Sequence, residues 1–247
     1  MSVEIPIPDE NDIRIAVLVP SHTEVKAGFC HSLANMVANF ANAKYEGGGK
    51  KEIEVINVGG SMLPEVRHRL VAEAMKWGAT HALWLDSDMM FPRDTLQCLL
   101  RHNLPIVGAN YPRRQKPCIP TGHLGNQNGG MLWTEDGDNS VVEVKHLGGG
   151  VMLVDMRVYD LLDLPFFMFE MTENKLGLRG EDVYFCMKAK EAGIPVFCDQ
   201  ELSQHIGHIG EYVFTNQDSI RFRDEAKARN GGSDKAAEAE LDKQAAE

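Results

Sequence analysis

The chain has 247 residues, of which 43% are apolar and 25% are charged, a balance that is typical of a folded globular protein. Its formal charge of −11, from 36 acidic and 25 basic residues, argues against a protein that holds nucleic acid chiefly through phosphate contacts. Its five cysteines include no CxxC pair, so the sequence fits neither a disulfide framework nor a zinc site of the usual spacing.

The N-terminal segment lacks the pattern of a signal peptide. Residues 1–12 carry acids and prolines, where a signal peptide needs basic residues followed by an apolar core. Elsewhere, no apolar run approaches the roughly 18 residues that a membrane-spanning helix needs. The sequence therefore predicts a cytoplasmic protein without a membrane span.

The apolar pattern in the first half of the chain alternates between strand spacing and helix spacing. In chain order, we expect a strand over 13–19, a helix over 25–44, a strand over 52–58, a helix from a Ser61 cap to a Gly78 C-cap, a strand over 79–85, a short helix from Pro92 to about 102 and a strand over 106–111. Such alternation predicts right-handed crossovers and an α/β fold, with a mostly parallel central sheet flanked by helices.

The second half is less regular, with a Pro- and Gly-rich loop over 111–130. After it we expect a hairpin of 131–133 with 141–146, a strand over 148–155, a helix over 181–192 and a strand over 194–199. From about residue 224 the chain is charged and Ala-rich, which indicates a frayed helix or a disordered tail.

In sheets of this kind, ligands bind beyond the carboxyl ends of the parallel strands. Three polar segments follow predicted strands at that edge: Pro20-Ser21-His22, Gly59-Gly60-Ser61 and Asp86-Ser87-Asp88. The sequence therefore predicts a ligand site where these segments meet.

Asp86 and Asp88 interrupt the apolar stretch HALWLDSDMMFP, where uncompensated carboxylates are costly. A divalent cation bound through oxygen would neutralise both and leave positions for phosphate oxygens. The alternative is a capping pair ahead of the helix that Pro92 begins. A second pair of the same spacing, Asp136 and Asp138, lies among polar residues and indicates an ordinary turn.

Two further polar clusters follow in the second half. Glu181 and Asp182 stand at the predicted start of a helix, where the dipole and the free amides favour anions. In HIGHIG, either His205 or His208 could complete an oxygen-rich site for an ion such as Mn²⁺. Taken singly, these acids are an ordinary helix start, and each histidine could be a surface or packed residue.

The order of the motifs resembles that of the GT-A fold glycosyltransferases that use nucleotide sugars, and it looks most like the bacterial and viral family-2-type enzymes. The matching pieces, over roughly 13–215, are PSHTEV, GGSMLPEVRHRLVAEAM, LWLDSDMMFP, IVGANYPR, GGGVMLVDMRVYDLL, GEDVYFCMKAKEAGIPVF and GHIG. The resemblance implies a leader over 1–12, a Rossmann-like nucleotide-sugar-binding half over 13–112, a smaller mixed β acceptor and catalytic half over 113–215, and a charged C-terminal helix or tail over 216–247.

The resemblance also implies a metal site. It assigns Asp88 first and Asp86 second to a Mn²⁺ or Mg²⁺ ion that bridges the diphosphate of the donor; the acid that matches Asp86 commonly reaches the ribose or nucleotide side instead. His208 looks like the C-terminal metal ligand of the family, and His205 is the reserve. Neutralising the leaving diphosphate in this way contributes several kcal/mol.

In inverting relatives, the acid that matches Asp182 is the general base, and Glu181 would hydrogen-bond the acceptor or the sugar. Pro20, Ser21 and Thr23 are candidates to hold the base and the ribose. Arg67 would meet the nucleotide or Asp86, or else be a solvated helix residue. The remaining candidates are Gly148, Gly149 and Gly150 for close backbone approach to a ligand, Arg113, Arg114 and Lys116 for the diphosphate, and Tyr111 and Trp133 for a sugar ring. The three cationic side chains could equally be solvated on a loop. The two aromatic rings could equally be packed in the core.

The predicted function is transfer of a hexose from a nucleotide-diphosphate donor, with a UDP-sugar favoured, to a hydroxyl group on a glycan, a protein, a lipid or a modified nucleic-acid base. The match of Glu181 and Asp182 favours inversion. Two alternatives are a non-catalytic module that binds a nucleotide or a glycan, and a nucleotidyltransferase that makes sugar nucleotides. A nucleotidyltransferase of this kind needs a Gly-, Arg- and Lys-rich phosphate loop after the first strand, whereas PSHTEVKAG has one lysine and one glycine.

Overall fold

The structure is a computed structural model that describes residues 12–44, 49–125, 130–172 and 177–246. The predicted leader, 1–12, lies outside these residues except for its last position. The helices are α1 (Ala27–Asn42), α2 (Leu63–Trp77), α3 (Thr95–Leu100), α4 (Arg157–Leu161), α5 (Glu181–Glu191), α6 (Gln200–Ser203), α7 (Asn216–Arg229) and α8 (Asp234–Ala246). The strands are β1 (Ile13–Ser21), β2 (Lys51–Gly59), β3 (His81–Leu85), β4 (Met89–Met90), β5 (Ile106–Gly108), β6 (His123–Gly125), β7 (Gly130–Met131), β8 (Val141–Val144), β9 (Val151–Asp155), β10 (Glu170–Met171), β11 (Leu178–Arg179), β12 (Val196–Asp199), β13 (Gly207–Ile209) and β14 (Val213–Phe214).

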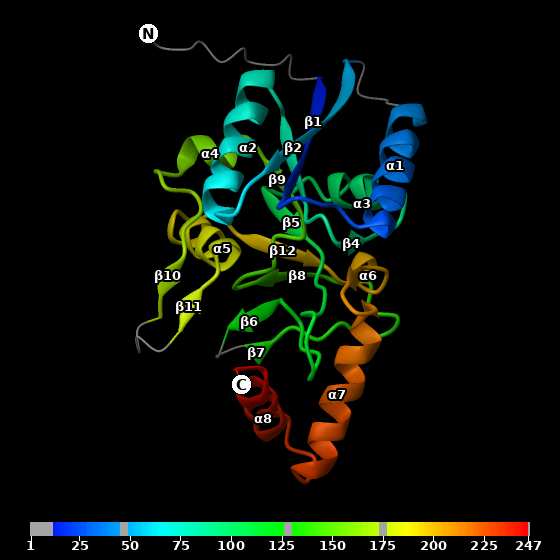
Figure 1. Cartoon of the computed structure of the whole chain (residues 1–247), viewed down its shortest axis with the longest axis vertical. Coiled ribbons are helices and arrows are strands. Elements are labelled where there is room, and N and C mark those ends of the chain that lie inside the picture. The colour runs from blue at the N-terminus through cyan, green and yellow to red at the C-terminus, as the bar shows by residue number, and fades with distance from the viewer. Residues whose placement is uncertain (1–11, 45–48, 126–129, 173–176, 247) are drawn as a thin grey trace.

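A seven-stranded sheet with the order β2-β1-β3-β9-β5-β12-β8 forms the centre of the molecule (Figure 1). The pairs β1–β2, β1–β3 and β5–β12 are parallel, whereas β9 is antiparallel to β3 and β5, and β8 is antiparallel to β12. Strands β2, β1, β3, β5 and β12 therefore run in one direction. The predicted fold class, α/β with a mostly parallel central sheet flanked by helices, is confirmed.

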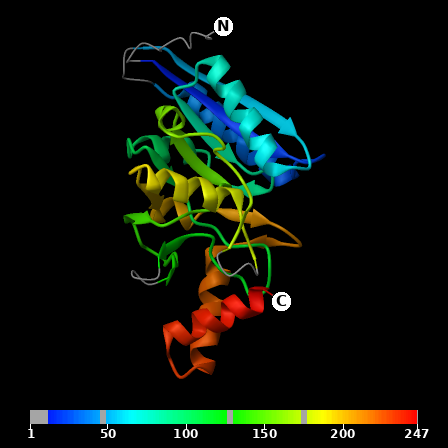
Figure 2. The ribbon, with the colours of Figure 1, turned by 90° about the vertical axis from the view of Figure 1, so that its left-hand side faces the viewer.

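Alternation along β1 explains how helices cover both faces of the sheet. Ala16 and Leu18 pack with Leu70 of α2, in a cluster that also contains residues of α5. Ile15 and Val17 point to the other face, where α1, α3 and α6 contribute buried side chains. The two views of the ribbon show α2 and α5 on one side of the sheet and α1 on the other (Figures 1 and 2).

Three smaller antiparallel sheets flank the central one: β14-β13-β4, β10-β11 and β6-β7. In the first, β13 pairs with β4 in the register His208 with Met89 and Gly207 with Met90. Because β4 directly follows the Asp86-Ser87-Asp88 segment, this pairing brings the C-terminal part of the chain to the edge where β3 ends.

Three details of the predicted local structure are wrong. Segments 131–133 and 141–146 do not form a hairpin, because β7 pairs with β6 and β8 pairs with β12. Met62 takes the N-cap position of α2 in place of Ser61. Helix α3 begins at Thr95, three residues after Pro92. The C-terminal segment, for which the sequence left a frayed helix or a disordered tail open, is helical: it forms the packed helices α7 and α8, which project from the end of the molecule beside β7 (Figures 1 and 2).

Among the described residues, no helix is both long enough and apolar enough to cross a membrane.

Gly78 ends α2 as expected, with φ +74° and ψ +40° in the left-handed region. A Cβ atom at this position is strained, so we expect Gly78→Ala to lower the free energy of unfolding by about 1–2 kcal/mol, as measured by urea denaturation. Lys76→Ala, an exposed change in the last turn of the same helix, serves as control and should stay within about 0.5 kcal/mol of wild type. Equal stability of the Gly78→Ala variant and wild type would contradict this account of the helix end.

Candidate functional site

The carboxyl ends of β1, β2 and β3 meet at one edge, as the sequence predicts. Ser21 and Gly59 are register partners at the ends of β1 and β2, and Gly60 N donates to Ser21 O over 3.0 Å. Asn57 Nδ2 donates to Val19 O (2.8 Å) and to Ser21 Oγ (3.0 Å), which fixes the end of β1. Pro20 and Ser21 belong to β1 itself, with Pro20 buried, whereas Thr23 is exposed on the loop that follows.

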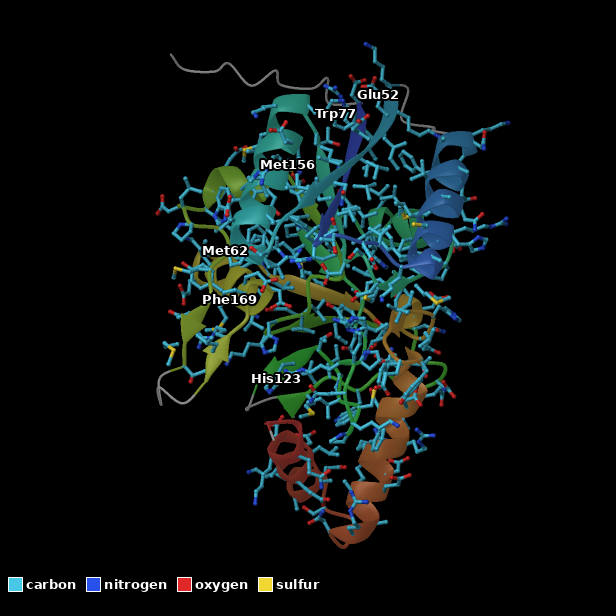
Figure 3. All side chains as sticks on the ribbon, in the orientation of Figure 1. Glu52, Met62, Trp77, His123, Met156 and Phe169 are labelled. Atoms are coloured by element: carbon cyan, nitrogen blue, oxygen red, sulfur yellow. The ribbon has the colours of Figure 1, made fainter. Side chains whose placement is uncertain are left out.

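Arg67 links two of the predicted site acids. Helix α2 has its Met62 end toward this edge and its Trp77 end away from it (Figure 3), so Arg67, near the start of the helix, reaches the strand ends. Its Nη2 donates to Asp86 Oδ1 over 2.9 Å and its Nε donates to Glu181 Oε1 over 3.0 Å. The guanidinium is buried, at 2% side-chain exposure, and lies 4.9 Å from the centroid of the Trp84 ring.

The charges in this cluster hold one another in place. Burial alone would lower the pKa of Arg67, but the carboxylates of Asp86 and Glu181 more than offset it, and the pKa is raised. Burial raises the pKa of Asp86; Arg67 opposes this rise, while the nearby carboxylates of Asp88 and Asp182 add to it. An additional positive charge near Asp86 would therefore relieve repulsion among three acids.

Glu181 has a role that the sequence did not predict. Its carboxylate is buried against Arg67, and burial raises its pKa, with Asp182 adding to the rise and Arg67 opposing it. In this structure the carboxylate of Glu181 therefore positions Arg67.

Asp88 lies between an imidazole and a guanidinium. His208 Nε2 is 3.4 Å from Asp88 Oδ1, and Arg114 Nη1 is 2.9 Å from Asp88 Oδ2. Burial alone would raise the pKa of Asp88, but the hydrogen bond and charge of His208, followed by the charge of Arg114, lower it. His205, the other candidate in HIGHIG, is exposed and no contact joins it to Asp88.

The orientation of His208 is set by a carbonyl group. His208 Nδ1 lies 2.9 Å from Pro112 O, and because a carbonyl oxygen only accepts, Nδ1 carries the proton. In the neutral imidazole, Nε2 is then an acceptor that faces another acceptor, Asp88 Oδ1. A proton or a metal ion between the two atoms would satisfy both.

Asp182 lies at the start of α5. Its Oδ2 accepts from Gly149 N over 3.2 Å, and its Oδ1 accepts from Val183 N over 2.7 Å. Both bonds come from backbone amides, so the carboxylate is held in position without a cationic side-chain partner among these contacts. Asp182 raises the pKa of Asp86, which indicates that the two carboxylates are close enough to interact.

The three consecutive glycines lie against Arg67 and Tyr111. A Cβ atom on Gly149 would come within 3.0 Å of Arg67 Nη2, and one on Gly150 would come within 2.7 Å of Tyr111 Oη. Gly150 N donates to Tyr111 Oη over 2.8 Å. The Tyr111 ring in turn packs edge-on against His208, with the ring centroids 5.3 Å apart. The glycines therefore let the backbone lie close to a neighbouring group, and in this structure the neighbours are the side chains of Arg67 and Tyr111.

A pocket of about 610 Å³ opens beside His208 and Arg114. Its charged lining consists of Lys26, Arg113 and Arg114 against Glu211. In a chain with a formal charge of −11, this local excess of positive charge favours an anionic ligand. Lys116 and Trp133, also considered from the sequence, lie elsewhere: Lys116 is over the Tyr212 ring, and Trp133 Nε1 donates to Glu238 of α8.

Asp88 and His208 are two side chains that could hold a divalent cation. Among the described residues, no group of three or more His, Cys, Asp or Glu side chains is arranged to hold a metal ion by itself. Mg²⁺ and ions like it are commonly bound by one or two carboxylates together with substrate phosphates, so two protein ligands beside an anion-binding pocket suit such an ion. In this structure the guanidinium of Arg114 places a positive charge beside Asp88.

No protein-family model matches the sequence, and no curated protein matches it. Solved structures do match: the A197 protein of STIV does so with a TM-score of 0.52 at 14% identity, over 80% of this chain and 86% of that chain. GalNAc-T7 with UDP, GalNAc and Mn²⁺ has a TM-score of 0.49 at 12% identity, over 86% of this chain and 48% of that chain. The catalytic domain of Drosophila beta1,4galactosyltransferase 7 in complex with xylobiose has a TM-score of 0.43 at 17% identity, over 80% and 71%.

The similarity to A197, at this identity, shows a shared fold and nothing about activity. The other two TM-scores are below 0.5, so those similarities support no conclusion about this chain. A function for the protein therefore has to be argued from its own site.

Removal of the Arg67 guanidinium would leave Glu181 buried without its partner. We expect Arg67→Met to lower the free energy of unfolding by about 3–5 kcal/mol, measured by urea denaturation. The double variant Arg67→Met/Glu181→Leu removes both members of the pair, so it should lose less stability than the sum of the single variants. Additive losses in this cycle, or a stable Arg67→Met protein, would show that the buried pair does not organise the site.

Proposed function

We propose that the protein is a metal-dependent glycosyltransferase that moves a sugar from a nucleotide-diphosphate donor to a hydroxyl acceptor. The observation that carries this proposal is the contact between Asp88 and His208. These residues are far apart in the sequence, yet their carboxylate and imidazole face each other at 3.4 Å, with the imidazole oriented by Pro112 O. The order of sequence motifs that resembles the GT-A enzymes supports the same conclusion.

The donor would lie along the carboxyl edge of the sheet. Its nucleoside would meet Pro20 and Ser21 at the end of β1 and Thr23 on the loop that follows, and its diphosphate would enter the pocket that Lys26 and Arg113 line. A UDP-sugar is the favoured donor, on the resemblance alone.

Asp88 and His208 would hold a Mn²⁺ or Mg²⁺ ion, and Asp86, the second acid assigned to the metal by the resemblance, is paired with Arg67. Such an ion, when bound, neutralises charge on the diphosphate leaving group. Arg67 would keep Asp86 in place throughout, because its guanidinium is buried and also bonded to Glu181.

Asp182 would act as the general base. It would accept the proton of the acceptor hydroxyl while the hydroxyl oxygen attacks the anomeric carbon and the bond from that carbon to the diphosphate oxygen breaks. The amides of Gly149 and Val183 would hold its carboxylate in position for the transfer. Direct attack by the acceptor inverts the configuration at the anomeric carbon. The acceptor class stays open among glycans, proteins, lipids and modified nucleic-acid bases.

We expect Asp88→Asn to reduce turnover at least about 100-fold, because the loss of several kcal/mol of charge stabilisation at the leaving group corresponds to that range. The assay is UDP release from a panel of UDP-sugars with Mn²⁺ and candidate acceptors. Asp136→Asn, the same change in the other Asp-x-Asp pair, is the matched control and should leave turnover unchanged.

Thermal unfolding separates the interpretations of Asp88. If Asp88→Asn retains wild-type turnover, the metal role is wrong. If the variant instead unfolds, Asp88 is a structural residue of the loop after β3. Binding of UDP-sugars without any turnover in wild type would indicate a binding module, and synthesis of sugar nucleotides with release of pyrophosphate would indicate a nucleotidyltransferase.

Asp182→Asn should lower the rate of sugar transfer by about 10²–10⁴-fold and leave donor binding close to wild type, because the amide cannot accept the proton but keeps the shape of the side chain. Transfer is measured with the best donor of the panel, and donor affinity by calorimetry. Product analysis by NMR should show inversion. A normal rate of transfer in this variant would place the base at another residue.

A further inference from the structure

Two arginines neutralise the two acids that follow β3, and they differ in their freedom to move. Arg67, which binds Asp86, is buried at 2% side-chain exposure and has a second carboxylate partner in Glu181. Arg114, which binds Asp88, is 46% exposed and lines the pocket. The first arginine is therefore a fixed part of the site, whereas the second can leave its carboxylate for solvent or for a ligand in the pocket.

We propose that Arg114 is an exchangeable counter-ion of Asp88, which holds this carboxylate until a divalent cation binds and then pairs with a phosphate of the donor. The inference rests on the proposed function, because it takes Asp88 and His208 as the ligands of the cation. It adds a residue that couples the binding of the metal to the binding of the nucleotide.

The geometry makes Arg114 a competitor of a cation at Asp88. Its Oδ2 is 2.9 Å from Arg114 Nη1, and its Oδ1 faces His208 Nε2 at 3.4 Å. A divalent cation between Asp88 and His208 would lie close to the guanidinium, and like charges at such separations repel strongly in a partly buried site. Arg114 must then withdraw, or the cation binds with reduced affinity.

The loop that carries Arg114 allows this movement without a change of the fold. Arg113 N donates to Ile119 O over 2.8 Å and Thr121 N donates to Tyr111 O over 2.9 Å, which ties the two ends of the loop together. The Arg114 side chain stands beside the opening of the 610 Å³ pocket, with Arg113 and Lys26 also in its lining. A guanidinium matches the geometry of phosphate oxygens, which it can bind through two parallel hydrogen bonds.

The exchange couples the binding of the cation to the binding of the nucleotide. A phosphate in the pocket draws Arg114 away from Asp88 and so favours the cation, and by linkage the cation favours the nucleotide to the same extent. In the absence of nucleotide, Arg114 competes with free metal ions for Asp88.

The test measures binding of Mn²⁺ alone, by electron paramagnetic resonance of the free ion, and of UDP with and without Mn²⁺, by calorimetry. We expect Arg114→Gln to bind Mn²⁺ about fivefold or more tightly than wild type in the absence of nucleotide, and to bind UDP more weakly. The rise in Mn²⁺ affinity that UDP produces in wild type should shrink in this variant. Arg114→Lys, which keeps the charge, should bind Mn²⁺ closer to wild type than Arg114→Gln does.

Arg113→Gln is the matched control, because Arg113 lines the same pocket but is not paired with Asp88. It should weaken UDP binding and leave the affinity for Mn²⁺ alone unchanged. The inference is overturned if Arg114→Gln and wild type bind Mn²⁺ equally well while Asp88→Asn abolishes that binding. If Asp88→Asn does not alter Mn²⁺ binding, the proposed metal site itself fails, and the role of Arg114 fails with it.

Discussion

The crowding of carboxylates at the carboxyl edge of the central sheet is the constraint on which the site depends. Asp86, Asp88 and Asp182 lie close enough that Asp88 and Asp182 both raise the pKa of Asp86. Such a cluster persists only with positive charge beside it. Arg67 supplies part of this positive charge from a buried position, and the absence of a side chain at Gly149 leaves room for its guanidinium. Close to Asp88, the positive charge comes from Arg114, which is 46% exposed and, in our proposal, gives way to a cation.

Much of the fold follows from local sequence pattern. The alternation of strands and helices, the end of α2 at Gly78 and the position of the acids after β3 depend on contacts within short segments, and the structure bears them out. The pairing of β8 with β12 depends on distant partners, so the polar turn over 134–140 suggested the wrong hairpin. The charged composition of the C-terminal segment gave no sign that Ala226, Ala237 and Leu241 would be buried. They pack against Ile119 and Met131.

The sequence predicted the edge of the site better than its internal contacts. The rule that ligands bind at strand ends selected Asp86 and Asp88 as candidate site residues, and the order of motifs added His208 and Asp182. The pairing of Glu181 with Arg67 was missed, because it joins two helices that are far apart in the chain. The contact of Arg114 with Asp88 was missed as well, since Arg114 lies on an irregular loop whose direction no periodic pattern fixes.

The most direct test of the central claim is a crystal of the protein soaked with Mn²⁺ and UDP and measured at the manganese absorption edge. The account predicts one strong anomalous peak between Asp88 and His208, in contact with a phosphate oxygen of UDP, and Arg114 turned from Asp88 toward the phosphates. An ion bound at a distance from both side chains, or UDP bound in this pocket with no ion, would contradict it.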